Sequence, residues 1–249
     1  MINVTCEKLK GLRLPSMVAE YRRQTELPAT HSLGFDDRLS MIVDAECLAR
    51  YNKKLSELIR LAKLREPSAC LEDIDYDSKR KLDKTLVARL SSCVWVKEGR
   101  NVIITGSCGT GKTYLASAFG NAACRMGLKV RSYRVTRLLT DLHIGRGDGS
   151  YNRLLADLKK PDLLILDDFG IAPIDQTAAR DLLEVIDDRH SVKATLITAQ
   201  LPVADWHGIF EDPTAADAIL DRLVHNSYRF PLAGPSLRVT EPKAEQSNG

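Results

Sequence analysis

The sequence predicts an α/β fold, in which helices flank a parallel β-sheet. From about residue 101 onward, short β-branched or apolar runs alternate with stretches of helical periodicity. Strands that alternate with helices need crossover connections, and such connections build a parallel sheet. One of the runs, Leu163-Leu164-Ile165-Leu166, is apolar throughout, as expected for a strand covered on both faces.

The first part of the chain is predicted to be helical. Between residues 36 and 65, apolar residues recur every three or four positions, and Pro67 ends the run. Pro15 and Pro28 separate shorter helical stretches before it. In the second part, strands are expected at residues 102–105, 129–135, 163–166, 194–199 and 227–232, and helices at residues 114–126 and 175–189.

These patterns divide the chain into three parts. Residues 1–68 are predicted to form a small helical N-terminal domain, and residues 69–240 the α/β domain. Residues 241–249 are polar and are expected to form a disordered tail.

The composition allows a sizeable core, because 44% of the 249 residues are apolar. No stretch approaches the ~20 apolar residues of a membrane span, and the N-terminus lacks the pattern of a secretion signal. The six cysteines are scattered singly, which is typical of a reducing compartment rather than of a disulfide framework or zinc site. We therefore expect a cytoplasmic protein without a membrane partner.

Charge is distributed unevenly along the chain, although the net charge of +3 does not by itself indicate a nucleic-acid partner. Residues 125–160 contain nine Lys or Arg and three acids. Such a local excess forms a phosphate-attracting stripe if the side chains share a face. A solvated helix surface with no partner is an equally good interpretation of these residues alone.

Residues 106–113 match the phosphate-loop pattern G-x-x-x-x-G-K-[ST]. A predicted buried strand precedes them and a predicted helix follows, which is the context that the motif requires. Backbone N–H groups of such a loop point at a β-phosphate, and the helix N-terminus adds the positive end of its dipole. The sequence therefore predicts binding of ATP with Mg²⁺ by Gly106, Ser107, Cys108, Gly109, Thr110, Gly111, Lys112 and Thr113.

Lys112 is expected to reach the β- and γ-phosphates, and the Thr113 hydroxyl to ligate Mg²⁺. The second half of the site should be an acid at the end of a neighbouring buried strand, and residues 163–166 lead directly into Asp167-Asp168. We expect Asp167 to hold Mg²⁺, mostly through water. Asp168 is expected to orient or deprotonate the attacking water. The alternative, a helix cap or turn, explains neither the apolar run nor the upstream loop.

Two further features suggest parts of a hydrolytic site. The predicted strand at residues 194–199 places Thr198 and Gln200 near the expected γ-phosphate, where either could hold the lytic water. An ordinary strand end is the alternative. Arg222, on a predicted helix, is a candidate for reaching the nucleotide of an adjacent subunit. A surface salt bridge with Asp217 or Asp221 is the alternative for this arginine, and spacing alone does not choose.

The order of these parts resembles the AAA+ ATPases, specifically the IstB-like branch related to the bacterial helicase loader DnaC. The resemblance covers most of the chain. It rests on the loop, the acidic strand end with Phe169-Gly170, and several shorter segments. Those segments are residues 12–17, residues 69–73, residues 195–202 with Asp205-Trp206, and Asp221-Arg222-Leu223.

The resemblance implies particular roles. Thr113 and Asp167 would be the metal positions, Asp168 the base and Arg222 the arginine finger between subunits. No C-terminal helical lid is expected after the last strand, and Arg238 is a weak substitute for the missing lid-borne sensor. Residues 136–151 correspond to the place where initiator-type members insert a DNA-facing helix. This favours DNA contact by Arg131, Arg134, Arg137, Arg146, Lys159 and Lys160.

Proteins similar to this one assist a DDE-type transposase of bacterial insertion sequences. The resemblance thus implies an ATPase that forms a homo-oligomer on double-stranded DNA and acts with a transposase. The closest alternative is a DnaC-like replicative helicase loader, which would share the ATPase core. A metabolic kinase and a nucleotide-gated scaffold that hardly hydrolyses ATP are further alternatives.

Overall fold

The computed structural model describes residues 2–237 and shows two compact units, Met1–Glu57 and Leu58–Gly249. The division falls inside one long helix, α3 (Phe35–Ala62). The predicted disordered tail and Arg238 lie outside the described residues, so both stay predictions, as does the predicted domain boundary at residue 68.

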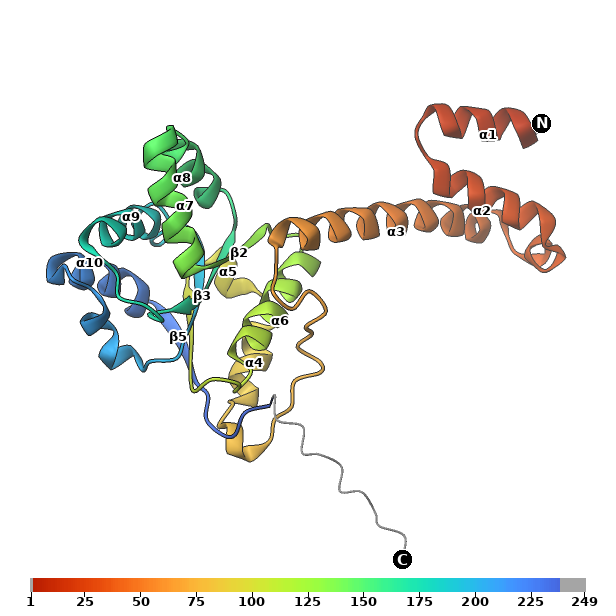
Figure 1. Cartoon of the computed structure of the whole chain (residues 1–249). Coiled ribbons are helices and arrows are strands. Elements are labelled where there is room, and N and C mark those ends of the chain that lie inside the picture. Colours follow the sequence, from red (N-terminus) through yellow and green to blue (C-terminus); the bar gives the residue numbers. More distant parts are fainter. Residues whose placement is uncertain (1, 238–249) are drawn as a thin grey trace, which may run out of the picture. The chain divides into compact units, whose positions relative to one another are not determined.

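The smaller unit is helical (Figure 1). It contains α1 (Ile2–Gly11), α2 (Pro15–Glu26), the 3-10 helix η1 (Pro28–Ser32) and most of α3. Pro15 and Pro28 each occupy the beginning of a helix, where the missing N–H of proline costs nothing. The Glu46 carboxylate of α3 accepts hydrogen bonds from the backbone N–H groups of Ser16 and Met17, at 2.9 and 3.3 Å. A glutamate distant in sequence therefore caps the start of α2.

The larger unit is a five-stranded parallel sheet with helices on both faces, as the sequence predicts. Its strands are β1 (Asn101–Thr105), β2 (Val130–Arg134), β3 (Leu163–Phe169), β4 (Ala194–Ala199) and β5 (Ser227–Pro231). Its helices are η2 (Ser78–Arg80), α4 (Lys84–Leu90), α5 (Val94–Lys97), α6 (Lys112–Arg125), α7 (Val135–Asp148), α8 (Tyr151–Lys159), α9 (Gln176–Asp187), η3 (Val203–Ile209) and α10 (Pro213–Val224).

The strand order is β2-β3-β4-β1-β5. The sequence prediction was wrong in one detail, because β3, which carries the acids, does not neighbour β1, which leads into the phosphate loop. Strand β4 lies between them and pairs with both. Since the carboxyl ends of parallel strands share one edge, this order brings Thr198 of β4 between the loop and the acids.

Each face of the sheet buries its own apolar layer. On one face, α7, α8, α9 and α10 pack over β1, β3 and β4 with side chains such as Leu138, Leu182 and Ile219. On the other, Trp95 of α5 meets Phe119 of α6 edge to face at 6.2 Å. The Phe119 ring in turn lies 5.9 Å from that of Phe230 of β5, tilted by 34°. Burial on both faces explains the continuously apolar strands.

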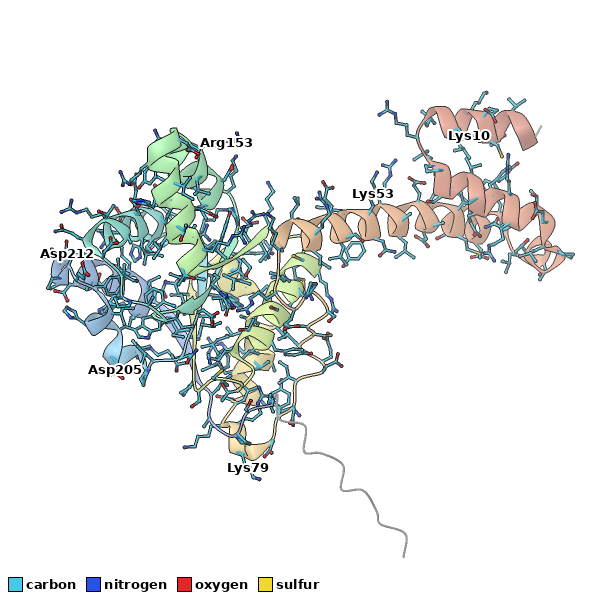
Figure 2. The ribbon with its side chains drawn as sticks, viewed as in Figure 1. Lys10, Lys53, Lys79, Arg153, Asp205 and Asp212 are labelled. Atoms are coloured by element: carbon cyan, nitrogen blue, oxygen red, sulfur yellow. The ribbon has the colours of Figure 1, made fainter. Side chains whose placement is uncertain are left out.

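The outer surface of the larger unit carries charged side chains, such as the exposed Lys79, Arg153 and Asp205 (Figure 2). Within residues 2–237, none of the helices is both long and apolar enough to span a membrane.

Candidate nucleotide site

The phosphate loop lies between the end of β1 and the start of α6, as predicted. Gly111 precedes α6 with a φ of 87°, a left-handed conformation that favours glycine. The Lys112 ammonium donates to the carbonyls of Gly106 and Ser107 at 2.7 and 2.8 Å. The loop thus closes around its lysine, and a phosphate would replace two neutral carbonyl acceptors with charged ones.

Two segments that the motif does not include support the loop from outside. Arg80, which is 5% exposed, donates from Nη2 to the Thr110 carbonyl at 3.1 Å and from Nη1 to the Asp75 carbonyl. The chain after β5 returns to the loop, where the Leu237 N–H donates to the Gly109 carbonyl at 2.9 Å. Ser236 lies so close to Gly109 that a side chain there would clash with it.

Asp167 is at the centre of the acidic half of the site. It is 1% exposed, and its carboxylate accepts hydrogen bonds from two hydroxyl groups. Thr113 Oγ1 lies 3.1 Å from Oδ1, and Thr198 Oγ1 donates to the same oxygen. The structure therefore joins the predicted metal residues, Thr113 and Asp167, and adds Thr198 of the intervening strand directly beside them.

Asp168 sits at an irregularity in the sheet. The pairing of β3 with β4 shifts register between Leu166 and Phe169, and Asp168 has a φ of 61°. An L-residue in this left-handed region needs support from its surroundings. Thr198 provides part of it, because its hydroxyl accepts the Asp168 N–H at 3.1 Å. One threonine thus positions both acids.

Phe169 anchors the chain just after the acids. Its ring lies 4.6 Å from that of the fully buried Trp206, whose Nε1 donates to the Leu201 carbonyl at 3.0 Å. This gives a structural reason for two of the segments that carry the family resemblance, Gln200-Leu201-Pro202 and Asp205-Trp206. They hold the end of β4, including the exposed Gln200, against the end of β3.

Two arginines converge on the acids. Arg65 Nη1 lies 2.7 Å from Asp167 Oδ2 and 3.0 Å from Asp168 Oδ2, and Arg134 Nε lies 3.0 Å from Asp168 Oδ2. The pKa of Arg65 is raised above its ordinary value, chiefly by the hydrogen bond to Asp167. Arg134 is one of the predicted DNA contacts, and in this structure its guanidinium is paired with an acid of the nucleotide site.

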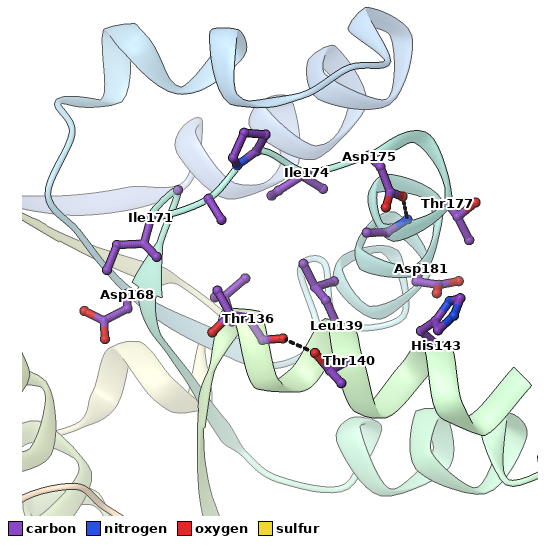
Figure 3. A pocket seen from close by; sticks show the side chains of 15 residues that line it. Thr136, Leu139, Thr140, His143, Asp168, Ile171, Ile174, Asp175, Thr177 and Asp181 are labelled. Atoms are coloured by element: carbon purple, nitrogen blue, oxygen red, sulfur yellow. Dashed lines mark hydrogen bonds between the residues drawn. The ribbon is translucent and has the colours of Figure 1, made fainter.

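Three cavities meet at these charged residues. A nucleotide cavity of about 360 Å³ is lined by the loop, Gln200, Arg65, Arg134 and Asp168. A second cavity of about 380 Å³ runs from Asp168 between α7 and the segment after β3, with His143 and Asp181 toward its other end (Figure 3). A third of about 560 Å³, called here the basic cleft, is lined by Lys63, Arg65, Arg131, Ser132, Tyr133, Arg134, Arg137 and Asp141.

The residues present fit a magnesium ion that is shared with phosphate. The Thr113 hydroxyl oxygen and a carboxylate oxygen of Asp167, both hard ligands, lie 3.1 Å apart. Within residues 2–237, no group of three or more His, Cys, Asp or Glu side chains could hold a metal by itself. Magnesium needs no such cage, because it retains water and takes its remaining ligands from substrate phosphates.

The fold does not place Arg222 near the phosphate loop of its own chain. Its Nε pairs with Asp187 at 2.6 Å rather than with Asp217 or Asp221, and its carbonyl accepts from Asn101 at 3.1 Å. Asn101 begins β1, whereas the loop follows the far end of that strand, about 13 Å away at the usual rise per residue. The guanidinium therefore lies at the opposite end of the sheet from the loop of its own chain.

The predicted DNA-contact residues differ in their partners. Arg146 pairs with the buried Asp181, Lys159 with Asp188 and Lys160 with Asp157. Arg131 donates to the Leu61 carbonyl at 3.0 Å. Arg137 is exposed and forms no ion pair within the part of the chain that the structure describes. The basic cleft brings together Arg131, Arg134 and Arg137, while the other three lie outside it.

Cys108 offers a direct probe of the nucleotide cavity, because it is exposed and lines the cavity. We predict that ATP with Mg²⁺, at about ten times its Kd, slows maleimide labelling of Cys108 about tenfold. Cys47, exposed in the smaller unit, should label at the same rate with and without nucleotide. Burial raises the pKa of Cys93 to about 11 and that of Cys124 to about 12, so both should stay unlabelled. Peptide mass spectrometry measures each rate, and unprotected Cys108 would contradict the assignment.

Arg80→Ala should destabilise the larger unit through the loop. The substitution removes the donor to the Thr110 carbonyl, in a buried hydrogen bond, and to the Asp75 carbonyl, in a part-buried one. We expect the free energy of unfolding to fall by about 2–3 kcal/mol in urea denaturation. Lys79→Ala, at the exposed neighbouring position, should change it by less than about 0.5 kcal/mol. Equal effects of both substitutions would show that Arg80 does not support the loop.

Comparison with known protein families shows which family this chain resembles in sequence. Residues 7–245 match the family described as IstB-like ATP binding protein. An insertion sequence ATP-binding protein of Sinorhizobium fredii is 43% identical over 234 residues, covering 94% of this chain and 95% of its own. The insertion sequence IS1162 ATP-binding protein of Pseudomonas fluorescens is 46% identical over 202 residues, covering 81% of this chain and 87% of its own.

Solved structures of other proteins share the fold of the α/β unit. The crystal structure of DnaI matches with a TM-score of 0.57 at 22% identity, over 73% of this chain and 93% of its own. AMPPCP-bound DnaA from Aquifex aeolicus matches with a TM-score of 0.57 at 20% identity, over 68% of this chain and 51% of its own. The α/β unit therefore has the AAA+ fold, and the chain belongs to the IstB-like ATP-binding protein family.

Proposed function

We propose that this protein is an ATP-dependent, DNA-binding AAA+ ATPase that oligomerises on duplex DNA and assists a transposase in insertion-sequence transposition. The observation that carries the proposal is the convergence of Lys112, Thr113, Asp167 and Asp168 at one edge of the sheet. The relatives named as insertion sequence ATP-binding proteins support the biological setting.

Each residue has a chemical part in the proposed reaction. Lys112 would bind the β- and γ-phosphate oxygens, and Thr113 and Asp167 would hold Mg²⁺, which would neutralise charge on those phosphates. Asp168 takes a proton from the attacking water. Thr198 donates to the Asp167 carboxylate and accepts the Asp168 backbone N–H, and Gln200, which lines the nucleotide cavity, orients the water.

The position of Arg222 supports a site shared between subunits. Its guanidinium lies at the far end of the sheet from the loop of its own chain, so it would serve the nucleotide of another copy. A contact between two different faces of identical chains generates a ring or a helical filament. Either form presents repeated phosphate-binding surfaces along DNA.

The basic cleft supports the proposed contact with DNA. It gathers five Lys or Arg and one acid at the β2 edge of the sheet. Side chains of this kind neutralise backbone phosphates irrespective of base sequence. We assign the first contacts to Arg131, Arg134 and Arg137 because all three line the cleft, although Arg134 also pairs with Asp168. Arg146, Lys159 and Lys160 lie outside the cleft and pair with acids, so they stay secondary candidates.

DNA binding should weaken steeply with salt, and this tests the proposal. In fluorescence anisotropy with a labelled duplex and a slowly hydrolysed ATP analogue, the affinity should fall at least about a hundredfold between 50 and 200 mM salt. Arg137→Ala should weaken binding to every sequence and reduce the salt slope by about one. Arg153→Ala, on α8 and outside the cleft, is the matched control. Binding that responds to neither nucleotide nor salt would contradict the proposal.

A replicative helicase loader is the second candidate, because the DnaC helicase loader shares the fold with a TM-score of 0.51 at 20% identity. The relatives at 40% identity and above favour the transposition role. Co-purification with a purified transposase or a purified replicative helicase, each with ATP, would distinguish the two.

A further inference from the structure

Arg65 belongs to no nucleotide-binding motif, yet its guanidinium touches both acids of the site. The contacts are 2.7 Å to Asp167 and 3.0 Å to Asp168. The preceding residue, Leu64, is buried against Gly120 of α6. The Asn121 amide of the same helix donates to the Pro67 carbonyl at 2.7 Å. Residues on either side of Arg65 in the sequence therefore contact α6, and these contacts fix the position of the segment.

Asp167 needs a cation for physical reasons. Its side chain is 2% exposed, and a carboxylate removed from water is costly unless it is paired. The hydroxyl groups of Thr113 and Thr198 donate hydrogen bonds but carry no charge. Within residues 2–237, the ion pair of Asp167 is with Arg65.

We propose that Arg65 is the counter-ion of Asp167 and Asp168 until magnesium arrives with the nucleotide, and that Mg²⁺ then displaces it. The inference rests on the proposed function, in which Thr113 and Asp167 hold that ion. A guanidinium and a divalent cation repel each other at one carboxylate, so each weakens the binding of the other.

The surroundings of Arg65 give the displaced side chain a place to go. Arg65 lines the nucleotide cavity and also the basic cleft, and its side chain is 38% exposed. Once released, the guanidinium enters the cleft beside Arg131 and Arg137. Binding of ATP with Mg²⁺ thereby frees the charge of one cleft arginine, which the two acids otherwise neutralise, for DNA phosphates.

The test is the Mg²⁺ dependence of nucleotide binding by the full chain. A fluorescent ATP analogue is titrated with Mg²⁺, and the half-saturating Mg²⁺ concentration is read for each variant. Arg65→Ala should lower this concentration about five- to tenfold, because the competing cation is gone. Its melting temperature in EDTA without nucleotide should also fall, because Asp167 loses its partner. Arg65→Lys should show a smaller change in the same direction, since one ammonium cannot span both acids as well.

Arg153→Ala is the matched control, because it removes an exposed arginine that lines neither the nucleotide cavity nor the basic cleft. Its half-saturating Mg²⁺ concentration should equal that of the unchanged protein. An unchanged or raised value in Arg65→Ala would overturn the inference, and Arg65→Lys decides in the same way if the alanine variant does not fold. Failure of the unchanged protein to bind the analogue at any Mg²⁺ concentration would instead overturn the proposed function.

Discussion

Arg222→Ala is expected to lower ATP hydrolysis about 10³-fold while leaving ATP binding unchanged. The arginine lies at the opposite end of the sheet from its own phosphate loop, so its loss affects only a site completed by a neighbouring subunit. Steady-state phosphate release measures the rate, and labelling of Cys108 or a fluorescent analogue measures binding.

Asp187→Ala separates this role from that of a surface ion pair. It breaks the 2.6 Å contact with Arg222 but leaves the guanidinium in place. Because the pair is partly exposed, its loss should hardly affect stability or hydrolysis. Equal losses of hydrolysis in the Asp187 and Arg222 variants would show that hydrolysis depends on the ion pair and not on Arg222 as an arginine finger between subunits.

Mixing two inactive variants tests the shared site further. In an equal mixture of Arg222→Ala and Asp168→Asn subunits, about one quarter of the interfaces join an intact arginine with an intact acid. Hydrolysis should therefore reappear in the mixture. No recovery, in mixtures shown to contain mixed oligomers, would contradict the proposed arrangement.

Lys112→Ala is expected to lower hydrolysis about 10²- to 10³-fold, because a charged donor to the phosphates is lost. Affinity for ATP should fall by about tenfold or more, since charge-assisted hydrogen bonds contribute to binding itself. Isothermal calorimetry measures the affinity. Lys97→Ala, an exposed lysine on α5 outside the nucleotide cavity, should leave both quantities unchanged.

The lysine variant also has a structural consequence. Lys112 is 7% exposed and bridges the carbonyls of Gly106 and Ser107. The melting temperature should therefore be measured beside the affinity. A variant that binds ATP as tightly as the unchanged protein would contradict the assignment of the loop.

The sequence predicted the parts of the site that depend on local pattern. The phosphate loop joins a strand to a helix, and Asp167 and Thr198 lie near the carboxyl ends of buried strands, so their positions follow from the parallel sheet. The order of the strands was not predictable in the same way. The insertion of β4 between β1 and β3 depends on long-range pairing that no periodicity encodes.

Arg65 and Arg80 were missed for a related reason. Arg65 lies 102 positions from Asp167 in the chain, and Arg80 lies 30 from Thr110. Neither stands in a motif, and charged residues in loops are normally solvated. The local basic excess was visible in the sequence, but the acids that neutralise Arg146 and Lys159 became apparent only from the folded chain.

The central claim is that ATP controls assembly of this protein on DNA through a site completed between subunits. Electron microscopy of the protein with duplex DNA, with and without ATP, tests it most directly. Rings or helical filaments should form on DNA with ATP, and they should be lost without ATP or in the Lys112→Ala variant. Single, unassembled molecules in the presence of ATP and DNA, or identical assemblies without nucleotide, would contradict it.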